Sequence, residues 1–341
     1  MTLDTTLTQL SEQIDHDLRV LIDQQAAYVA DFSGYFFGWL DQSFQPTSQV
    51  QRGKRLRPIL TLLICQAISG DTQRAMPLAL AIELIHNYSL IHDDIADRDE
   101  ERRGRPTVWK LVGDGLAINT GSVLYTLAYQ VITTLDAPAE RILEVHKKMV
   151  QTSIRLSEGQ HWDITYERSL KVDEGMYLNM IEGKTAALLE FAAWGGAFLA
   201  TEEEAVIDAY RRFGLHLGLA FQIRDDALSI WGDSKVTGKP PFSDLRNKKK
   251  SLPVTYAFSR LEGEALSRFQ ALYVNVEQHM TEGEIQEALR LLEQVGAQGY
   301  TQQLADFHTS AALRALDAAD QHSPAQAGLQ ALAQQLLGRV S

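Results

Sequence analysis

Apolar residues recur at a helical period along most of this chain. They stand at Leu10, Ile14, Leu18, Leu21 and Ile22 near the start, and in Ile285–Leu292, Leu313–Ala319 and Leu329–Leu337 near the end. Positions three or four residues apart lie on one face of an α-helix. The pattern therefore predicts amphipathic helices at both ends, two more helices at 120–135 and 139–156, and core or dimer contacts for the aromatic-rich segment 32–39.

The stretch Ala81–Thr107, AIELIHNYSLIHDDIADRDEERRGRPT, is predicted to begin as a buried helix and to end in charge. Its upstream half is apolar on most of the helix surface, which is typical of a buried element. With 3.6 residues per turn, Asp93 and Asp97 fall on one face, and Asp94 lies about 100° round from Asp93. Two carboxylates are therefore expected to point the same way.

The residue types at this helix end indicate a site for metal and phosphate. Carboxylates at the tip of a buried helix repel one another unless a cation or a proton intervenes. Oxygen ligands without cysteine suit Mg²⁺, whose coordination is usually completed by water and substrate phosphate. Arg102 and Arg103 follow closely and offer planar donor forks for phosphate oxygens. Taken alone, a DDxxD motif is equally compatible with a solvated acidic helix end.

A basic segment precedes the apolar run at 59–68. In QRGKRLRP, residues 51–58, Lys54, Arg55 and Arg57 place three cations in four residues at a predicted helix start. Basic side chains there oppose the helix dipole. A bound phosphate would offset this unfavourable charge. The alternative is a basic turn that is simply exposed to solvent.

Two segments in the middle of the chain add polar side chains to apolar helices. In EGQHWDI, Gln160 and Asp163 lie one turn apart, and in IEGKTAALLEF, Lys184 stands beside an apolar run. A buried lysine needs an anionic partner, so ligand binding is a reasonable interpretation. Thr185 could add a hydroxyl donor or cap a helix.

A second acidic cluster repeats the geometry of the first. Within 214–233, GLHLGLAFQIRDDALSIWGD, the polar positions are Gln222, Asp225, Asp226 and Ser229. A segment rich in lysine and proline follows at 237–253 and is expected to be a loop. Two such helices packed side by side would face acid against acid across a cleft ringed by Arg and Lys.

Composition narrows the class of protein. The chain has 341 residues, of which 45% are hydrophobic, and its formal net charge is -12. That charge argues against nucleic acid or an anionic membrane as the main partner. Cys65 is the only cysteine, so no internal disulfide can form and a reducing compartment is expected. The first residues do not resemble a secretion signal, and 185–200, interrupted by Glu190, is too short to span a bilayer. We therefore expect a cytoplasmic protein without stable membrane insertion.

In order along the chain, these motifs resemble the trans-isoprenyl diphosphate synthase, or polyprenyl synthetase, family. They are GKRLRP, HDDIAD with RRGRPT, GQHWD, GKT, FQIRDD and GKPPFSDLRNKKKSLP, between Gly53 and Pro253. The resemblance implies an all-α, single-domain orthogonal helical bundle around a deep central cavity, usually in a homodimer. The sequence has no strong linker, so we expect one domain over 1–341, with the motif-bearing core at about 50–255 and covering helices at about 256–341.

The resemblance also implies a reaction, the Mg²⁺-dependent head-to-tail condensation of isopentenyl diphosphate with an allylic diphosphate. Three Mg²⁺ ions would be held by Asp93, Asp97 and Asp225. The allylic diphosphate would be gripped by Arg102, Lys184, Lys239 and Lys249, with Thr185 and Gln222 at the reacting end. Isopentenyl diphosphate would lie on Lys54, Arg57, His86 and Arg103. Supporting positions would be Asp94, Asp226, Ser229, Gln160 and Asp163.

Some of these residues have a second interpretation, and two depart from the family pattern. His86 could be a satisfied core histidine, and Asp94 and Asp226 could orient neighbours or bind nothing. Ser229 replaces the last acid of the second DDxxD, which is expected to weaken support for the ligands without abolishing activity. Phe242 stands where the family commonly has glycine, which bears on the geometry of the loop that carries Lys239 and Lys249.

Product length is predicted from the helix that precedes the first cluster. Tyr88 lies five residues before Asp93, beside the small Ser89. A prenyl tail that grows along this helix would pass Ser89 and meet the ring of Tyr88. An aromatic residue there resembles synthases that stop near twenty carbons, so the predicted main product is geranylgeranyl diphosphate, with farnesyl diphosphate second.

Three other functions stay open at this point. Glu83 with His86 and Glu158 with His161 have the E-x-x-H spacing of di-iron carboxylate bundles, for which Glu182 and Glu190 could be the further ligands. A terpene cyclase would ionise a single prenyl diphosphate but would not need the cluster of Lys54, Arg57 and His86. A non-catalytic partner subunit would usually lack the first acidic cluster, which is complete here.

Overall fold

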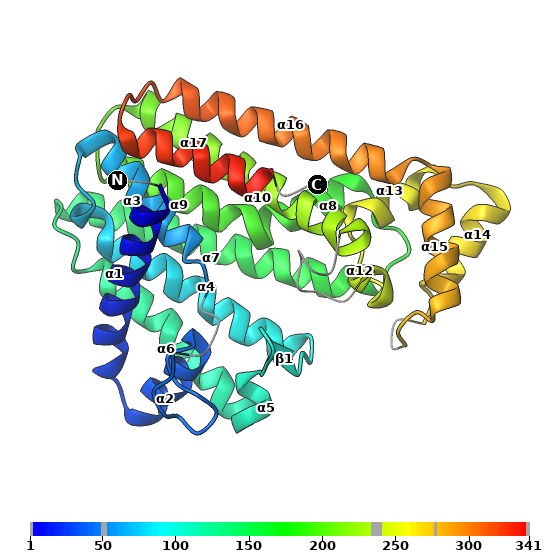
Figure 1. Ribbon diagram of the computed structural model, residues 1–341, viewed down its shortest axis with the longest axis horizontal. Coiled ribbons are helices and arrows are strands. Elements are labelled where there is room, and N and C mark those ends of the chain that lie inside the picture. Colours follow the sequence, from blue (N-terminus) through cyan, green and yellow to red (C-terminus); the bar gives the residue numbers. More distant parts are fainter. Residues whose placement is uncertain (1–2, 49–52, 233–240, 276–277, 339–341) are drawn as a thin grey trace. The chain divides into compact units, whose positions relative to one another are not determined.

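The computed structural model describes residues 3–48, 53–232, 241–275 and 278–338 and is almost entirely helical (Figure 1). Within those ranges, the strands form a single two-stranded hairpin. The prediction of an all-α fold is therefore confirmed.

The chain divides into two compact units. Unit 1 consists of Met1–Val150, Ala192–Ile207 and Gln321–Leu329; unit 2 consists of Gln151–Phe191, Asp208–Asp320 and Gln330–Ser341. Organisation as a single domain around a central cavity stays a prediction.

Each unit has its own helices, and four helices contribute residues to both. Unit 1 contains α1 (Leu3–Asp23), α2 (Ala27–Phe37), α3 (Leu56–Ser69), η1 (Gln73–Ala75), α4 (Met76–Ala96), β1 (Glu101–Arg102), β2 (Arg105–Pro106), α5 (Val108–Val112) and α6 (Asp114–Ile132). Unit 2 contains α8 (Glu174–Ile181), η2 (Glu182–Ala186), α12 (Ser243–Arg246), α13 (Leu252–Arg260), α14 (Gly263–Leu272), α15 (Glu282–Gln294) and α16 (Ala297–Ala318). The shared helices are α7 (Ala139–Glu167), α9 (Ala187–Phe198), α10 (Glu204–Trp231) and α17 (Pro324–Leu337).

Helix α4 carries the first acidic cluster and lies in the core of unit 1. It starts with Pro77 in its first turn, where the missing N–H costs nothing. Its apolar residues from Met76 to Ile91 are mostly buried, against α3 and α6 among others. The helix ends at Ala96, and the N–H of the capping residue Asp97 donates to the Asp93 carbonyl. The predicted buried helix with an acidic end is confirmed.

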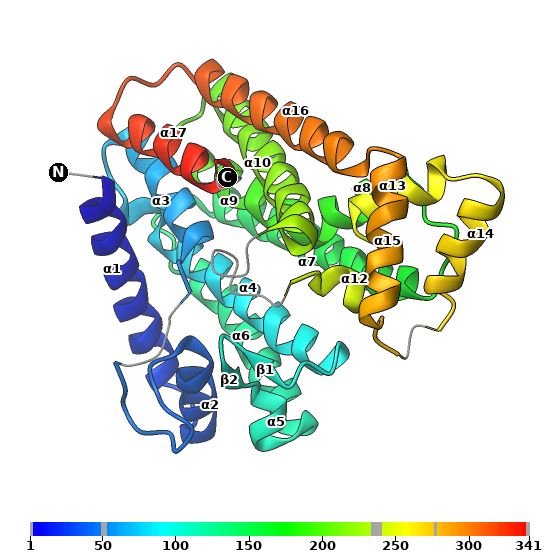
Figure 2. The same ribbon diagram turned by 45° about the vertical axis from the view of Figure 1, so that its right-hand side comes forward.

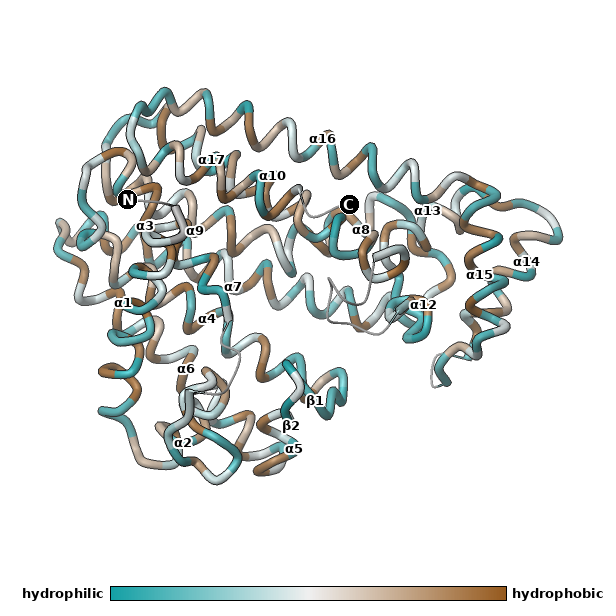
Figure 3. Tube along the Cα trace, in the orientation of Figure 1, coloured by the Kyte–Doolittle hydropathy of each residue, from teal (hydrophilic) through white to brown (hydrophobic). Residues whose placement is uncertain are grey.

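A hairpin follows the acidic end of α4, as Figure 2 shows, and sequence reasoning did not predict it. Strands β1 and β2 pair Arg102 with Arg105, and the two turn residues, Arg103 and Gly104, have φ values of +55° and +71°. Positive φ at both central positions matches a type I′ turn, which suits the twist of a two-residue hairpin. Figure 3 shows the segment as hydrophilic, in contrast to the helix before it.

In unit 2, a π-helical turn interrupts the run from α8 into α9. This turn is η2, which contains the motif GKT. Turns of this kind are rare and often mark functional sites. Gly159 of α7 packs directly on η2, because an ideal Cβ at this glycine would lie 2.1 Å from the backbone nitrogen of Lys184.

The described part of the predicted basic loop, from residue 241 on, contains helical structure that was not expected. The short helix α12 lies within it, and α13 begins at Leu252. Lys250 is buried and donates to the Glu167 carbonyl at 2.9 Å. Phe242 has φ +58°, in the left-handed region that glycine adopts at little cost. The departure from glycine that was noted in the sequence therefore falls on a residue in a strained conformation.

The predicted helices near the end of the chain are confirmed as α15, α16 and α17. No helix in the described ranges is long and apolar enough to cross a membrane. A cytoplasmic location stays a prediction.

Candidate active site

A buried arginine fixes the start of α3. Arg55 has φ +49° and is 2% exposed. Its Nε donates to Asp15 Oδ1 of α1 at 2.7 Å, and its Nη1 donates to Glu83 Oε1 of α4 at 2.9 Å. The guanidinium also lies over the ring of Phe37, 5.1 Å from the centroid. Of the three cations grouped in the sequence, Arg55 therefore anchors the segment, which leaves Lys54 and Arg57 as the candidates for binding phosphate.

Arg57 contacts His86 of α4. The Arg57 Nη1 donates to His86 Nε2 at 3.1 Å. Because arginine can only donate, this imidazole nitrogen accepts and the ring proton lies on Nδ1. Burial, followed by the charges of Arg57 and Arg103, keeps the pKa of His86 well below its usual value. His86 is thus a neutral histidine held by a cation.

Arg103 lies close to the same group. Its Nη2 would be 3.1 Å from an ideal Cβ at Gly53, so the guanidinium lies against the backbone of the basic segment. The structure therefore gathers Arg57, His86 and Arg103, three of the four side chains predicted for isopentenyl diphosphate. The fourth, Lys54, is exposed on the same segment.

Asp94 and Arg102 form an ion pair at the end of α4. Arg102 Nε and Nη2 lie 2.7 and 2.6 Å from Asp94 Oδ1. Burial raises the pKa of Asp94, although Arg102 opposes this shift. The Asp94 Oδ2 is buried without a hydrogen-bond partner among the described residues. Of the two interpretations of Asp94, the structure supports the one in which it orients a neighbour.

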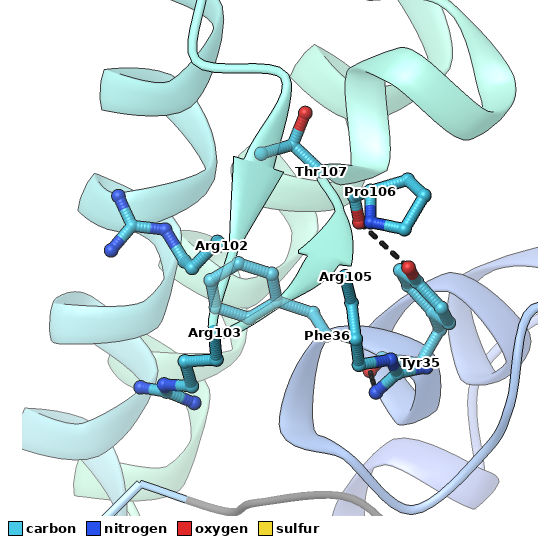
Figure 4. A pocket seen from close by; sticks show the side chains of 7 residues that line it. All are labelled: Tyr35, Phe36, Arg102, Arg103, Arg105, Pro106 and Thr107. Atoms are coloured by element: carbon cyan, nitrogen blue, oxygen red, sulfur yellow. Dashed lines mark hydrogen bonds between the residues drawn. The ribbon is translucent and has the colours of Figure 1, made fainter. Parts of the chain in front are cut away.

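The hairpin and α2 line a small hollow, shown in Figure 4. Its lining residues are Tyr35, Phe36, Arg102, Arg103, Arg105, Pro106 and Thr107. Arg105 lies against Tyr35, 4.0 Å from the ring centroid, and donates to the carbonyls of Tyr35 and Leu40. Arg105 therefore holds the hairpin on α2, which leaves the other two arginines to face the cluster on α3 and α4.

The aspartates predicted to bind metal offer carboxylate oxygens. Asp93 and Asp97 lie four residues apart at the end of α4, half-buried and exposed, and Asp225 is half-buried on α10. Hard oxygen donors that water can reach suit Mg²⁺, which keeps part of its hydration shell. The donor set therefore fits the predicted ion. The meeting of the two aspartate helices across one hollow involves both units and stays a prediction.

In unit 2, two predicted lysines share an acidic partner. Lys184 Nζ donates to Asp163 Oδ2 at 2.5 Å, and Lys249 Nζ lies 3.9 Å from that oxygen and donates to Glu167 Oε1 at 2.5 Å. Burial by itself raises the pKa of Asp163, but the two ammonium groups outweigh it and hold the pKa below its usual value. Asp163 thus positions both cations. Lys239 lies outside the described residues.

Thr185 and Gln222 are hydrogen-bonded to each other. The Thr185 hydroxyl donates to Gln222 Oε1 at 2.8 Å, and Gln222 Nε2 donates to Asp226 Oδ1 at 2.9 Å. Asp226 Oδ2 accepts from the Tyr177 hydroxyl at 2.6 Å and from the Leu252 N–H at 3.0 Å. In this structure the Thr185 hydroxyl hydrogen is used within the protein, and the role of Thr185 toward a ligand stays a prediction.

Burial, followed by the charge of Asp244, raises the pKa of Asp226 to about 7. The Ser229 hydroxyl donates to the Asp226 carbonyl at 2.8 Å. This hydrogen bond lies within α10, and the effect of Ser229 on activity stays a prediction. Both side-chain polar atoms of Gln160 are buried without a partner in the described part of the chain.

Tyr88 is held in a group of aromatic side chains. Its ring centroid lies 4.7 Å from that of Tyr125 on α6 and 5.3 Å from that of His92, and Tyr125 OH lies 2.7 Å from Tyr129 OH. Ser89 is buried beside it. The structure thus gives Tyr88 rigid support from α6, which the sequence did not reveal.

Three of the four glutamates of the di-iron alternative are engaged with arginines. Glu83 binds Arg55, as described above. Glu182 accepts from Arg155 Nη2, and Glu190 accepts from both Arg155 and Arg211 at 2.7 Å. Among the described residues, no group of three or more His, Cys, Asp or Glu side chains is arranged to hold a metal by itself. The geometry gives the di-iron reading no support.

Several functional neighbours were not found by sequence reasoning. Asp15, Glu167 and Tyr177 each complete a charged or hydrogen-bonded pair with a predicted residue. Asp15 and Tyr177 belong to no motif identified in the sequence, and Glu167 lies one helical turn beyond Asp163 on α7. Their partners are between 40 and 82 residues away along the chain, so no local pattern could have indicated them.

Comparison with known proteins identifies the family and fold of this chain. The family model for polyprenyl synthetase matches residues 38–292. The (2E,6E)-farnesyl diphosphate synthase of Mycobacterium tuberculosis is 38% identical over 270 residues, which cover 79% of this chain and 71% of the relative. The crystal structure of the geranylgeranyl pyrophosphate synthetase from Pyrococcus horikoshii has a TM-score of 0.88 at 33% identity, over 99% of this chain and 98% of that one. A polyprenyl synthase from Caulobacter crescentus, crystallised with calcium and isoprenyl diphosphate, has a TM-score of 0.82 at 27% identity, over 100% and 98% of the chains.

Proposed function

This chain belongs to the polyprenyl synthetase family and is a prenyltransferase, and from that premise we propose that it condenses isopentenyl diphosphate head to tail with an allylic diphosphate. The product we propose is geranylgeranyl diphosphate, with farnesyl diphosphate second. Relatives with both kinds of product match this chain. The choice between them rests on Tyr88.

The observation that carries the proposal is that cationic side chains gather in two separate groups with different partners. Arg57, His86 and Arg103 gather in unit 1, and Lys184 and Lys249 flank Asp163 in unit 2. A reaction that joins two diphosphates needs two anion sites, whereas a cyclase that ionises one diphosphate needs only one. The pair of groups therefore favours condensation.

The reaction has two steps for which these residues are suited. The allylic C–O bond breaks first, leaving positive charge on carbon and negative charge on the departing diphosphate. Lys184, Lys249 and Arg102 would stabilise that negative charge in a site that excludes water. Asp93, Asp97 and Asp225 would hold Mg²⁺, which when bound neutralises further diphosphate charge. A related protein crystallised with calcium and isoprenyl diphosphate supports a divalent cation beside this class of ligand.

In the second step, a carbon–carbon bond forms between the double bond of isopentenyl diphosphate and the allylic carbon. Arg57, His86 and Arg103 would hold the isopentenyl diphosphate in reach through its diphosphate group. A proton then leaves the new cation, and the departed diphosphate is the acceptor we propose. The neutral state of His86 suits a binding role, in which it adds a donor without adding charge.

The test is a condensation assay with labelled isopentenyl diphosphate, Mg²⁺ and allylic partners of five, ten and fifteen carbons. Chromatography of the dephosphorylated alcohols gives product length, and a parallel run with EDTA tests the need for a divalent ion. We expect twenty-carbon alcohol from each partner. Ionisation of the allylic partner without condensation would favour the cyclase reading, and no turnover at all would favour the partner-subunit reading.

Tyr88→Ala is the direct test of product length. Removing a ring packed on Tyr125 opens space along α4, so products longer than twenty carbons are expected. Tyr28→Ala is the matched control, because Tyr28 is an exposed tyrosine on α2 of the same unit. If both variants gave the wild-type product, Tyr88 would not limit the chain.

We also propose that the protein forms a homodimer. Large apolar side chains are exposed on α6 and α7, including Ile118, Leu143, Val150 and Ile154. On α7, spacings of seven and four residues place Leu143, Val150 and Ile154 on one helix face. Such a row is typical of a protein interface. Light scattering of the wild type and of Leu143→Glu with Ile154→Glu tests this, with a dimer expected only for the former.

A further inference from the structure

Four residues of unit 2 form a hydrogen-bond chain that ends at Thr185. It runs from Tyr177 of α8 to Asp226 of α10, then to Gln222 one turn earlier on α10, and then to Thr185 of η2. The three links measure 2.6, 2.9 and 2.8 Å. Tyr177 is 1% exposed and Asp226 is 5% exposed, so water does not compete at that end of the chain.

The links of this chain have a direction. A backbone N–H can only donate, and the Leu252 N–H together with the Tyr177 hydroxyl supplies two donors to Asp226 Oδ2. The other oxygen, Oδ1, accepts from the amide NH₂ of Gln222. With its NH₂ group turned to Asp226, Gln222 presents its carbonyl oxygen to Thr185. The Thr185 hydroxyl must then donate, and its oxygen has only lone pairs left for anything else.

We propose that Tyr177 and Asp226 are positioning residues that fix this direction, so that Thr185 meets the allylic group with oxygen lone pairs and not with a hydroxyl hydrogen. The inference rests on the proposed function. An allylic carbon that loses diphosphate becomes positive, and lone pairs stabilise a nearby cation while an O–H hydrogen repels it. If the Thr185 hydroxyl had the opposite orientation, its hydrogen would point at the developing cation and would oppose the reaction.

Asp226→Asn is expected to reverse the chain. Its side-chain oxygen would stay with the two donors at Oδ2, so its NH₂ would face Gln222 and the amide of Gln222 would have to turn. Thr185 would then accept from Gln222 and present its hydrogen outward. We expect kcat to fall about 100-fold, the loss typical of a misplaced catalytic group, while KM for the allylic diphosphate changes less than about threefold.

A double-mutant cycle distinguishes positioning from general structural support. Thr185→Val keeps the shape of the side chain and removes its hydroxyl. If Asp226 acts through Thr185, Asp226→Asn with Thr185→Val loses no more kcat than the worse single variant. Effects that multiply, or a loss confined to Mg²⁺ affinity, would overturn the inference. All four proteins are assayed over a Mg²⁺ titration that reaches saturation, so that kcat and Mg²⁺ affinity are measured separately.

Tyr177→Phe tests the far end of the chain and has a matched control. We expect about a tenfold loss of kcat, corresponding to the loss of one hydrogen bond. Tyr273 is also fully buried in unit 2, but its hydroxyl has no hydrogen-bond partner in the part of the chain that the structure describes. Tyr273→Phe should therefore keep kcat within about twofold. Equal losses in both variants would show that buried tyrosines matter here only for packing.

Urea unfolding of the same cycle separates this inference from the proposed function. Asp226→Asn and Thr185→Val should be coupled by about fivefold in the unfolding constant, since both alter one hydrogen-bond chain. This result needs no turnover. An inactive wild type with coupled unfolding would refute the proposed function and leave the directed chain standing, whereas uncoupled unfolding would refute the chain.

Discussion

Gly159→Ala tests whether close packing of α7 on the π-turn η2 positions the lysine and threonine of GKT. An ideal Cβ at Gly159 would lie 2.1 Å from Lys184 N, 2.7 Å from Gly183 C and 2.8 Å from Lys184 Cα. Carbon atoms in contact stay about 3.5 Å apart or more, so the two backbones must separate by roughly 1 Å. All three contacted atoms belong to the backbone, so no flexible side chain can absorb the strain.

The expected loss of stability follows from this separation. Overpacking of this kind costs about 3 kcal/mol, and the better helix propensity of alanine returns about 1 kcal/mol. The net loss of about 2 kcal/mol should lower Tm by roughly 3 °C for a chain of this length. A displacement of about 1 Å at Lys184 and Thr185 should also lower kcat about 100-fold. Thermal unfolding by circular dichroism and the condensation assay measure the two effects.

Gly299→Ala is the matched control. Gly299 is another helical glycine of unit 2, on α16, and an added Cβ there would meet nothing within 4 Å. It should gain up to about 1 kcal/mol of stability and keep wild-type kcat. If Gly159→Ala kept both Tm and kcat, the close contact would not position η2, and the reasoning would be refuted.

Three further predictions concern stability. Arg55→Met should lower the free energy of unfolding by about 3–5 kcal/mol, because it leaves Asp15 and Glu83 buried without their cation. Arg98→Met is the control, since it removes an exposed ion pair worth less than about 1 kcal/mol. Equal losses for the two variants in urea unfolding would contradict this prediction. His308 contacts His216, with 3.0 Å between their Nδ1 atoms, and burial, followed by that neighbour, lowers the pKa of His308 to about 4. The unfolded chain binds the proton at this histidine more tightly than the folded chain does. The contribution of His308 to the free energy of unfolding is therefore complete above about pH 6.5 and falls by up to about 3 kcal/mol as the pH drops to 4. The free energy of unfolding of His308→Gln should vary less with pH than that of the wild type. Thr281→Ala removes a capping box at the start of α15 and should cost about 1 kcal/mol; an unchanged urea midpoint would show that this helix end is held by packing alone.

The helices and the charged residues of the site could be predicted from the sequence, because both depend on the order of neighbouring residues along the chain. The period of apolar residues determined α4 and α10, and the DD pairs at their ends followed from spacing along one helix. The basic segment before α3 and the lysine of GKT could be recognised because cations at a helix start or beside an apolar run are unfavourable without an anionic partner. These features involve residues within a turn or two of each other, so the chain encodes them directly.

The tertiary structure decided which of those charges are available and how they are oriented. Among the three cations of GKRLRP, it buried Arg55 between two acids and turned Arg57 toward His86. It also set the direction of the hydrogen bond at Thr185, through Tyr177 and Asp226. These outcomes depend on partners that lie far away along the chain and meet only when the helices pack. Spacing within one segment carries no information about such partners, and for that physical reason the sequence alone named the residues of the site but not their roles.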